Sequence, residues 1–371
     1  MINGIIIDDA LQTIFSGYPR TPEVLDFYIE VKADVRERAE DLLTSQQIKD
    51  PKLAVTQAVK ELGDLTEVLQ MIAGQSQSTS NSVAADAMTT DQTVNETFTT
   101  AAIDRITLTA KFGNALLETS PDAAIHIQHF QTPKLKSYQL QIAQTDKTLA
   151  LQVPTPNWLK IITSFRYPHS KVVIQLPKTF AGTLQLDLSS GLLYLDQLQT
   201  PDTAIKTQVK SGRLQIDQTQ LSGLNAQAAS GSVAITQAAI GELVLNAKSG
   251  SVQLKAVKSH FYIGAHSGSI RGSQLTGSGD FAAHSGSIRL DWAALMGNIN
   301  LSAHSGSIKM QTPITDAFNF NLQTAAGTVK VSRPAQYQVE AQGVAIGRTN
   351  QATETSPTIT AKAKSGSVRV N

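Results

Sequence analysis

Basic and imidazole side chains recur at two fixed places beside a repeated Ser-Gly-Ser motif in the second half of the chain. Rows of cations attract anionic polymers and acidic phospholipid headgroups, because the attraction adds along the row. The place one residue before the first Ser of the motif is occupied by Lys210, Lys248, His266, His284, His304 and Lys364, and the place four residues after it by Arg271, Arg289, Lys309, Lys330 and Arg369. The eight lysines and arginines among them are therefore candidates for binding an anionic ligand. A second interpretation stays open, in which long cationic side chains only solvate an exposed face and discourage aggregation.

Three histidines share one sequence context and raise the question of a metal site. His266, His284 and His304 each stand in the segment Ala-His-Ser-Gly-Ser-Ile. Imidazole is the commonest metal ligand, and three of them can hold zinc when they converge on one point. Equivalent residues of a repeat point the same way, however, and no carboxylate belongs to this column. We expect stacked surface histidines and no bound metal, with a face that gains charge on acidification.

Catalytic chemistry has little support in this sequence. The chain has no cysteine, which excludes a thiolate metal site, a Cys nucleophile and a disulfide framework. Its carboxylates in the repeat fall in different columns, at Asp187, Asp196, Asp217, Asp280 and Asp291. Ser-Gly-Ser also differs from the nucleophile elbow G-x-S-x-G. We expect neither an enzyme nor a cofactor. Nucleic acid is not an expected partner, because aromatic residues make up 5% of the chain and do not alternate with the basic columns.

The spacing of the motif predicts the architecture that positions these side chains. Its glycines are Gly191, Gly212, Gly231, Gly250, Gly268, Gly286, Gly306, Gly327 and Gly366, at steps of 21, 19, 19, 18, 18, 20, 21 and 39 residues. The last step is two periods, and Gly347 stands where the missing glycine is expected. A period of about 20 residues is typical of a solenoid whose units stack on one another.

Apolar residues at every second position on either side of the motif indicate strands. The third residue after the first Ser, for example, is Ile270, Ile288 or Ile308 in successive units. This pattern predicts a mainly β fold, a parallel β-solenoid in which a strand, a Ser-Gly corner and another strand form each coil. Glycine at the corner is expected to supply positive φ. The crossover rule favours right-handed winding.

Charge and composition divide the chain into four parts. Residues 1–74 carry 13 acidic and 7 basic residues, and the remainder carries 17 acidic and 24 basic residues. We expect an acidic helical domain at 1–74, a polar linker at 75–97, a β-rich capping or irregular portion at 98–185 and the regular solenoid at 186–371. No basic segment precedes the apolar stretch at the N-terminus, and no stretch has the length of a membrane span, so neither a signal peptide nor a transmembrane segment is predicted.

The first part has the periodicity of a small helical bundle. One apolar stripe runs through 23–43, a second helix is predicted at 50–62 with Pro51 in its first position, and a third begins at Asp64. The segment Asp26-Phe27-Tyr28, together with 58–64 (AVKELGD), resembles the HAAS-type helical domain of Firmicute envelope-signalling proteins.

The repeat region resembles the bacterial putative-adhesin β-strand repeat family, and the whole arrangement resembles the LiaX-like proteins of lactobacilli and enterococci. This resemblance implies a non-enzymatic, Gram-positive cell-envelope protein that senses or resists envelope stress. It also implies a surface location. We expect a protein partner for the helical domain. An intracellular regulator or scaffold, whose helical domain docks a membrane sensor, is the alternative.

Overall fold

The helices and the strands belong to two separate compact units of the computed structural model. The structure describes residues 4–18, 28, 31, 32, 35, 36, 38–40, 42, 43, 48, 50–61, 91–132, 138–154 and 169–371. Each unit is described by itself below.

The helical unit contains α1 (Gly4–Phe15) and α3 (Pro51–Glu61), and the described residues between 28 and 43 are helical too. Val31, Val35 and Ala39 of the predicted stripe are buried, together with Ile7 and Leu11 of α1. The sequence had indicated α3 but not α1, and the helix predicted from residue 64 lies outside the described residues. No helix in the described part of the chain is long and apolar enough to cross a membrane.

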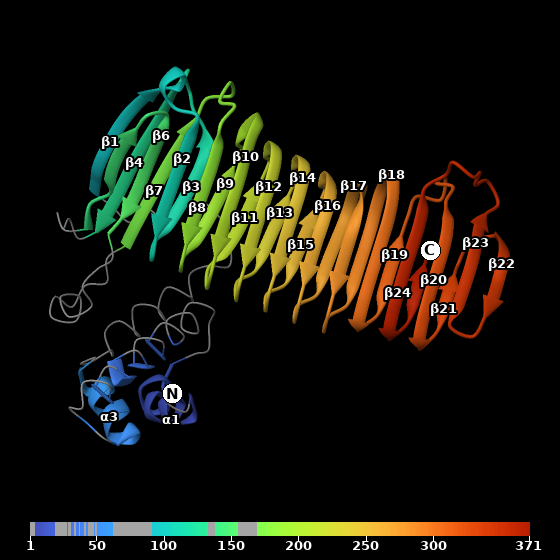
Figure 1. The fold of residues 1–371 in the computed structure, drawn as a ribbon, viewed down its shortest axis with the longest axis horizontal. Helices are drawn as coiled ribbons and strands as arrows, with labels where there is room; N and C mark the ends of the chain where they lie inside the picture. Colours follow the sequence, from blue (N-terminus) through green and yellow to red (C-terminus); the bar gives the residue numbers. More distant parts are fainter. Residues whose placement is uncertain are drawn as a thin grey trace. The chain divides into compact units, whose positions relative to one another are not determined.

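The second unit is a parallel β-solenoid with two layers of strands that share one core, which confirms the predicted fold (Figure 1). In spatial order, the first layer consists of β6 (Thr148–Val153), β2 (Arg105–Ala110), β8 (Thr183–Leu188), β10 (Gln199–Val209), β12 (Gln220–Ala228), β14 (Ala239–Ala247), β16 (Lys258–Ala265), the ends of β17 (Ile270–Ala283) and β18 (Ile288–Ser305), β24 (Thr358–Ser365) and β20 (Asn319–Ala326).

The second layer lies beyond the Ser-Gly corners. It consists of β7 (His169–Leu176), β3 (Asn114–Thr119), β9 (Leu192–Asp196), β11 (Arg213–Asp217), β13 (Val233–Thr236), β15 (Val252–Lys255), the beginnings of β17 and β18, β19 (Ile308–Gln311), β25 (Val368–Val370) and β21 (Val329–Val331). Inward and outward residues alternate along the strands of both layers, as in β24. The outward columns of the two layers therefore face in opposite directions.

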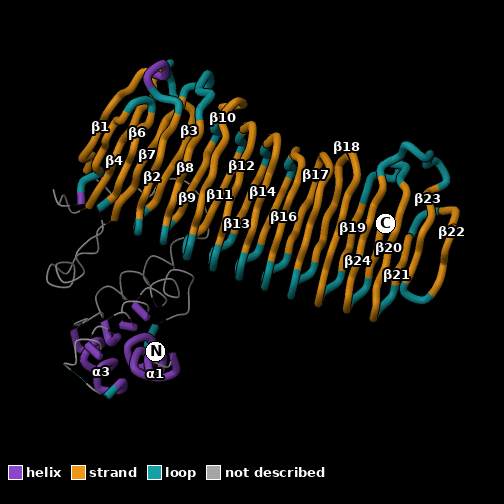
Figure 2. Tube along the Cα trace, viewed as in Figure 1, coloured by secondary structure: helices purple, strands orange, loops and turns teal. Residues whose placement is uncertain are grey.

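Corner glycines are required for a different reason from the one expected. Only three of the predicted corners, Gly191, Gly327 and Gly366, have positive φ. At Gly250, whose φ is not positive, a Cβ would overlap the carbonyl oxygen of Gly231 in the neighbouring coil. Stacked corners approach so closely that no side chain fits between them, and the loops line up along the edge of the rod (Figure 2).

The return corner of five successive coils was not predicted at all. A single residue with φ between 46° and 55° turns the chain from the second layer back to the first. These residues are Gln197, Gln218, Gln237, Ala256 and Gln274. Each is followed by a buried residue, such as Leu198 or Val257, that anchors the turn in the core.

Coils at the C-terminal end are stacked out of chain order. Strands β24 and β25 lie between β18–β19 on one side and β20–β21 on the other (Figure 1). The 39-residue step therefore hides an excursion, in which β22 (Ala335–Ala341) and β23 (Val344–Thr349) add to β20 as antiparallel strands. The prediction for Gly347 was wrong, because this glycine lies within β23 opposite Phe320 and Tyr337 and forms no corner.

The N-terminal end is closed in a similar way. Residues 105–119 form a regular coil with its corner at Gly113, directly against β8 and β9. The strands β1 (Asp91–Thr99), β4 (Ala124–Thr132) and β5 (Gln141–Thr145) pair antiparallel and cap this end, with a short 3-10 helix at Thr100–Ala102. Part of the range predicted as irregular is thus a normal coil, and the range predicted as linker overlaps β1 from Asp91 onward.

A buried histidine in this N-terminal cap predicts acid sensitivity. His129 is fully buried, its Nε2 lies 3.0 Å from Ser170 Oγ, and the Leu140 amide donates to its Nδ1 at 3.3 Å. Burial lowers the pKa of His129 to about 4. Because the unfolded chain binds a proton near pH 6.5, the folded state loses stability as the pH falls from about 6.5 to about 4.

We expect a loss of about 2 kcal/mol at pH 5 relative to pH 7.5, measured by urea unfolding of the solenoid. His129→Gln should be less stable at pH 7.5 and should lose much of this pH dependence. His169→Gln, at an exposed position of β7, is the matched control and should behave like the wild type. An equal pH dependence in the wild type and His129→Gln would show that other groups cause it.

Candidate anionic-ligand surface

The second layer carries an uninterrupted column of five cations on its outward side. Register pairs Arg271 with Arg289, Arg289 with Lys309, Lys309 with Arg369, and Arg369 with Lys330. We call Arg271, Arg289, Lys309, Arg369 and Lys330 the arginine ladder. Chain order had suggested a gap after Lys330, but the interleaved coil places Arg369 between the two lysines.

The electrostatics of the arginine ladder favour a multivalent anion. Neighbouring rungs are one strand spacing apart, about 4.8 Å, so like charges repel by up to about 1 kcal/mol per pair in water. Four of the five side chains are exposed and Lys309 is half-buried. Within the described residues, no carboxylate forms an ion pair with any of them. An external anion would relieve this repulsion at several rungs at once.

The first layer carries a second column, in which lysines flank the three histidines. The rings of His266 and His284 stack with centroids 4.8 Å apart, and those of His284 and His304 stack at 4.7 Å. Lys248 precedes His266 in register, and Lys364 follows His304 through the interleaved β24. We call Lys248, His266, His284, His304 and Lys364 the histidine ladder.

Positive charge beside His304 opposes protonation of this imidazole. Lys364 lowers the pKa of His304, and burial and His284 lower it further. The positions of the eight predicted cations are thus resolved: five form the arginine ladder, two flank the histidines on the opposite layer, and Lys210 is separated from Lys248 by Ala229.

The stacked histidines are not arranged to share a metal ion. Two imidazole nitrogens bound to one zinc ion at about 2.1 Å each lie no more than about 4.2 Å apart. Parallel rings with centroids 4.7 and 4.8 Å apart present equivalent nitrogens at the strand spacing instead. Across the described residues, no group of three or more His, Cys, Asp or Glu side chains is placed to hold a metal.

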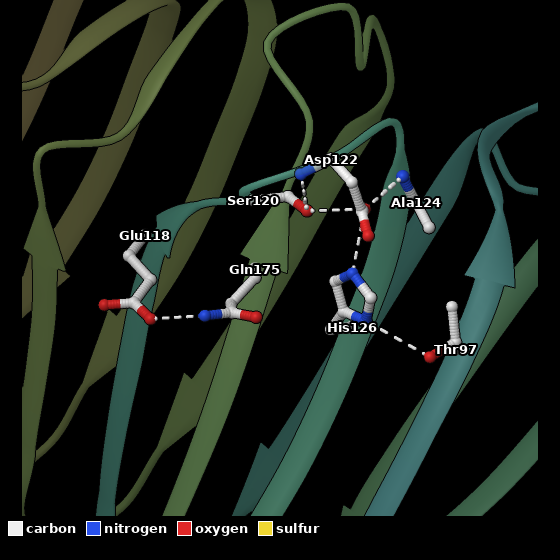
Figure 3. Close-up of polar contacts among 7 residues, drawn as sticks. All are labelled: Thr97, Glu118, Ser120, Asp122, Ala124, His126 and Gln175. Atoms are coloured by element: carbon white, nitrogen blue, oxygen red, sulfur yellow. Dashed lines mark hydrogen bonds and ion pairs between the residues drawn. The ribbon is translucent and has the colours of Figure 1, made fainter.

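Sequence patterns had not pointed to a polar cluster at the N-terminal cap (Figure 3). His126 lies between Asp122, at 2.8 Å from its Nε2, and Thr97, at 3.1 Å from its Nδ1. The Asp122 carboxylate also accepts from the Ala124 amide, which is the main cause of its lowered pKa. A carboxylate, an imidazole and a hydroxyl are thus linked in a row, as in some catalytic sites. Here, however, these contacts join β1 to the turn before β4. The cluster is part of the cap.

Among the comparisons with known proteins, the match to a family model identifies the family. No curated protein is significantly similar in sequence. Three solved structures each match 76% of the chain: a "putative cell adhesion protein" from Clostridium sporogenes (9% identity, 98% of that chain, TM-score 0.29), a "putative adhesin" from Bacteroides fragilis (15%, 97%, 0.37) and one from Parabacteroides distasonis (11%, 98%, 0.30). Residues 103–371 match the model of the Toastrack DUF4097 family, a range that contains both ladders, and the chain belongs to this family.

Proposed function

We propose that the solenoid is a non-enzymatic binding rod of the cell envelope, which attaches through its arginine ladder to an anionic envelope polymer or an acidic lipid surface. The observation that carries this proposal is the register that brings cations from five coils into one unbroken column without an intramolecular counter-ion among the described residues. Attachment of this kind fits an adhesin or a protein that senses envelope stress. The acidic helical unit then binds a protein partner.

Neutralising three rungs tests the proposal. We expect Arg271→Gln/Arg289→Gln/Lys309→Gln to bind phosphatidylglycerol-rich vesicles roughly 100-fold more weakly than the wild type, since each cation near an anionic surface contributes about 1 kcal/mol. Vesicle co-sedimentation at low and high salt measures the difference. The Tm should be nearly unchanged, because the substitutions remove repulsion between two exposed cations and the half-buried Lys309.

A matched variant separates position from net charge. Lys171→Gln/Lys206→Gln/Lys258→Gln removes three exposed cations that lie outside both ladders. This variant should retain binding close to that of the wild type. Equal weakening in both triple variants would show that overall charge attracts the vesicles and would overturn the role of the arginine ladder.

The compartment is part of the proposal and has its own test. Protease treatment of intact cells should trim the solenoid if the protein is exposed at the surface. A solenoid that stays intact in whole cells but is cleaved after lysis would overturn the surface location and favour the intracellular scaffold.

A further inference from the structure

A groove runs along the first layer beside the histidine ladder, on the face opposite the arginine ladder. Its volume is about 960 Å³, and all five residues of the histidine ladder line it. The floor consists of Gly264, Ala282 and Ser302, which stack in register and are all small. Asn246 lies at one end of this floor and Lys362 at the other. A chain-like ligand can therefore lie along the rod, across several strands.

The far side of the floor is polar and offers different chemistry. Tyr262, Asp280 and Asn300 stack there in register and line an adjoining hollow of about 500 Å³. Asn300 Nδ2 donates to Asp280 Oδ1 at 2.7 Å, which leaves the second carboxylate oxygen to accept from a ligand. Lysines and imidazoles on one side suit acidic groups, and the carboxylate, amide and phenol on the other suit hydroxyl groups.

We propose that this groove binds a linear acidic glycan, with its acidic groups along the histidine ladder and its hydroxyl groups toward Asp280 and Asn300. A bare polyphosphate suits the site less well, because it has no donor for the Asp280 carboxylate. The inference rests on the proposed function only in treating the solenoid as a binding surface. It assigns a different face and a different ligand.

Geometry makes this binding dependent on pH. None of the three imidazoles has a side-chain hydrogen-bond partner among the described residues, so the ring nitrogens of all three are available to a ligand. Lys248, Lys362 and Lys364 oppose protonation, whereas Asp280 and the more distant Glu242 favour it. His260, the other histidine on this face, is bonded to Ser278 and Tyr262 at 2.7 and 2.9 Å. An anionic ligand that arrives as the pH falls stabilises the charged rings.

The test uses the full chain and a short oligogalacturonate, with a maltooligosaccharide of equal length as the neutral reference. Uronate carboxylates stay ionised from pH 8 to pH 5.5, so a change in affinity over this range comes from the protein. We expect calorimetry to show binding at least about tenfold tighter at pH 5.5 than at pH 8, since each added charge on the column contributes about as much as one basic residue near an anionic surface.

Two variants locate the site. His266→Asn/His284→Asn/His304→Asn should lose the gain at pH 5.5, and Ala282→Tyr, which fills the groove from an exposed position, should lose binding at both pH values. The arginine-ladder variant Arg271→Gln/Arg289→Gln/Lys309→Gln should keep the gain, so failure of the proposed function leaves this result unaffected.

Three results would overturn the inference. These are equal binding of the neutral glycan, a pH response that persists in the histidine variant with an unchanged Tm, and polyphosphate binding that exceeds oligogalacturonate binding and resists Ala282→Tyr.

Discussion

Gly250→Ala is expected to lower the Tm of the solenoid by roughly 5 °C, whereas alanine at a second glycine of the rod should have little effect. The added methyl group would overlap the Gly231 carbonyl oxygen, which belongs to the backbone and cannot rotate away. The two coils must then separate at the corner, which weakens the hydrogen bonds on both sides. We estimate a cost of about 3 kcal/mol or more for this forced backbone shift, which corresponds to that change in Tm for a domain of this size.

Gly223→Ala provides the matched control in the same rod. Gly223 lies in β12, where the nearest atom to an added Cβ is the Glu242 carbonyl oxygen at 3.7 Å, an ordinary contact. Alanine should change stability there by no more than about 1 kcal/mol, because it also restricts the unfolded chain. Calorimetry of both variants decides the matter: similar melting temperatures would refute close stacking as the reason for glycine at the corner.

Deletion of residues 358–371, which contribute only β24 and β25, is expected to release residues 319–349 from the rest of the rod. In the described structure, residues 288–311 and 319–331 do not pair with each other, and each pairs with this segment instead. Without it, four strand edges, those of β18, β20, β19 and β21, lose their partners, and core residues such as Leu301 and Leu322 are exposed to water. Unpaired edges of this kind also promote aggregation.

Hydrogen exchange shows whether the end of the rod is released or whether β20 pairs directly with β18. Protection should fall in 288–311 and in 319–349 but persist in 183–236, since each coil contacts only its neighbours. A peptide with the sequence of 356–371, added in trans, should restore this protection, and a scrambled peptide should not. If 319–331 stayed protected without the peptide, β20 would have paired directly with β18, and the segment would be dispensable.

Repeat columns made much of the fold and of the ladders predictable. Burial of Ile270, Ile288 and Ile308 follows from alternation, because a parallel stack repeats the same inward and outward positions in every coil. The outward position of Arg271 and Arg289 follows from the same rule. The inward or outward position of a residue in a repeat column can be predicted from its place within its own coil.

The order of coils could not be predicted in the same way. A 39-residue step fits a skipped motif as well as an excursion, since the alternation of apolar residues makes Val368 face inward in either arrangement. The neighbours Lys364 and His304, which link the histidine ladder, depended on that choice. The return corner at Gln218 or Gln237 was missed because glutamine is no marker of positive φ, and the close approach of corner glycines is a contact between coils rather than a property of one turn.

Because both ends of the stack are capped, the number of coils between the caps can change without changing the caps. Antiparallel strands terminate the stack at both ends, and each coil between them contacts only the coil above and the coil below. A second copy of residues 268–285 would therefore add one arginine and one histidine rung about 4.8 Å farther along, without disturbing either end. Because linked weak contacts multiply, the valence of each ladder, and with it avidity for a long polyanion, scales with the number of coils.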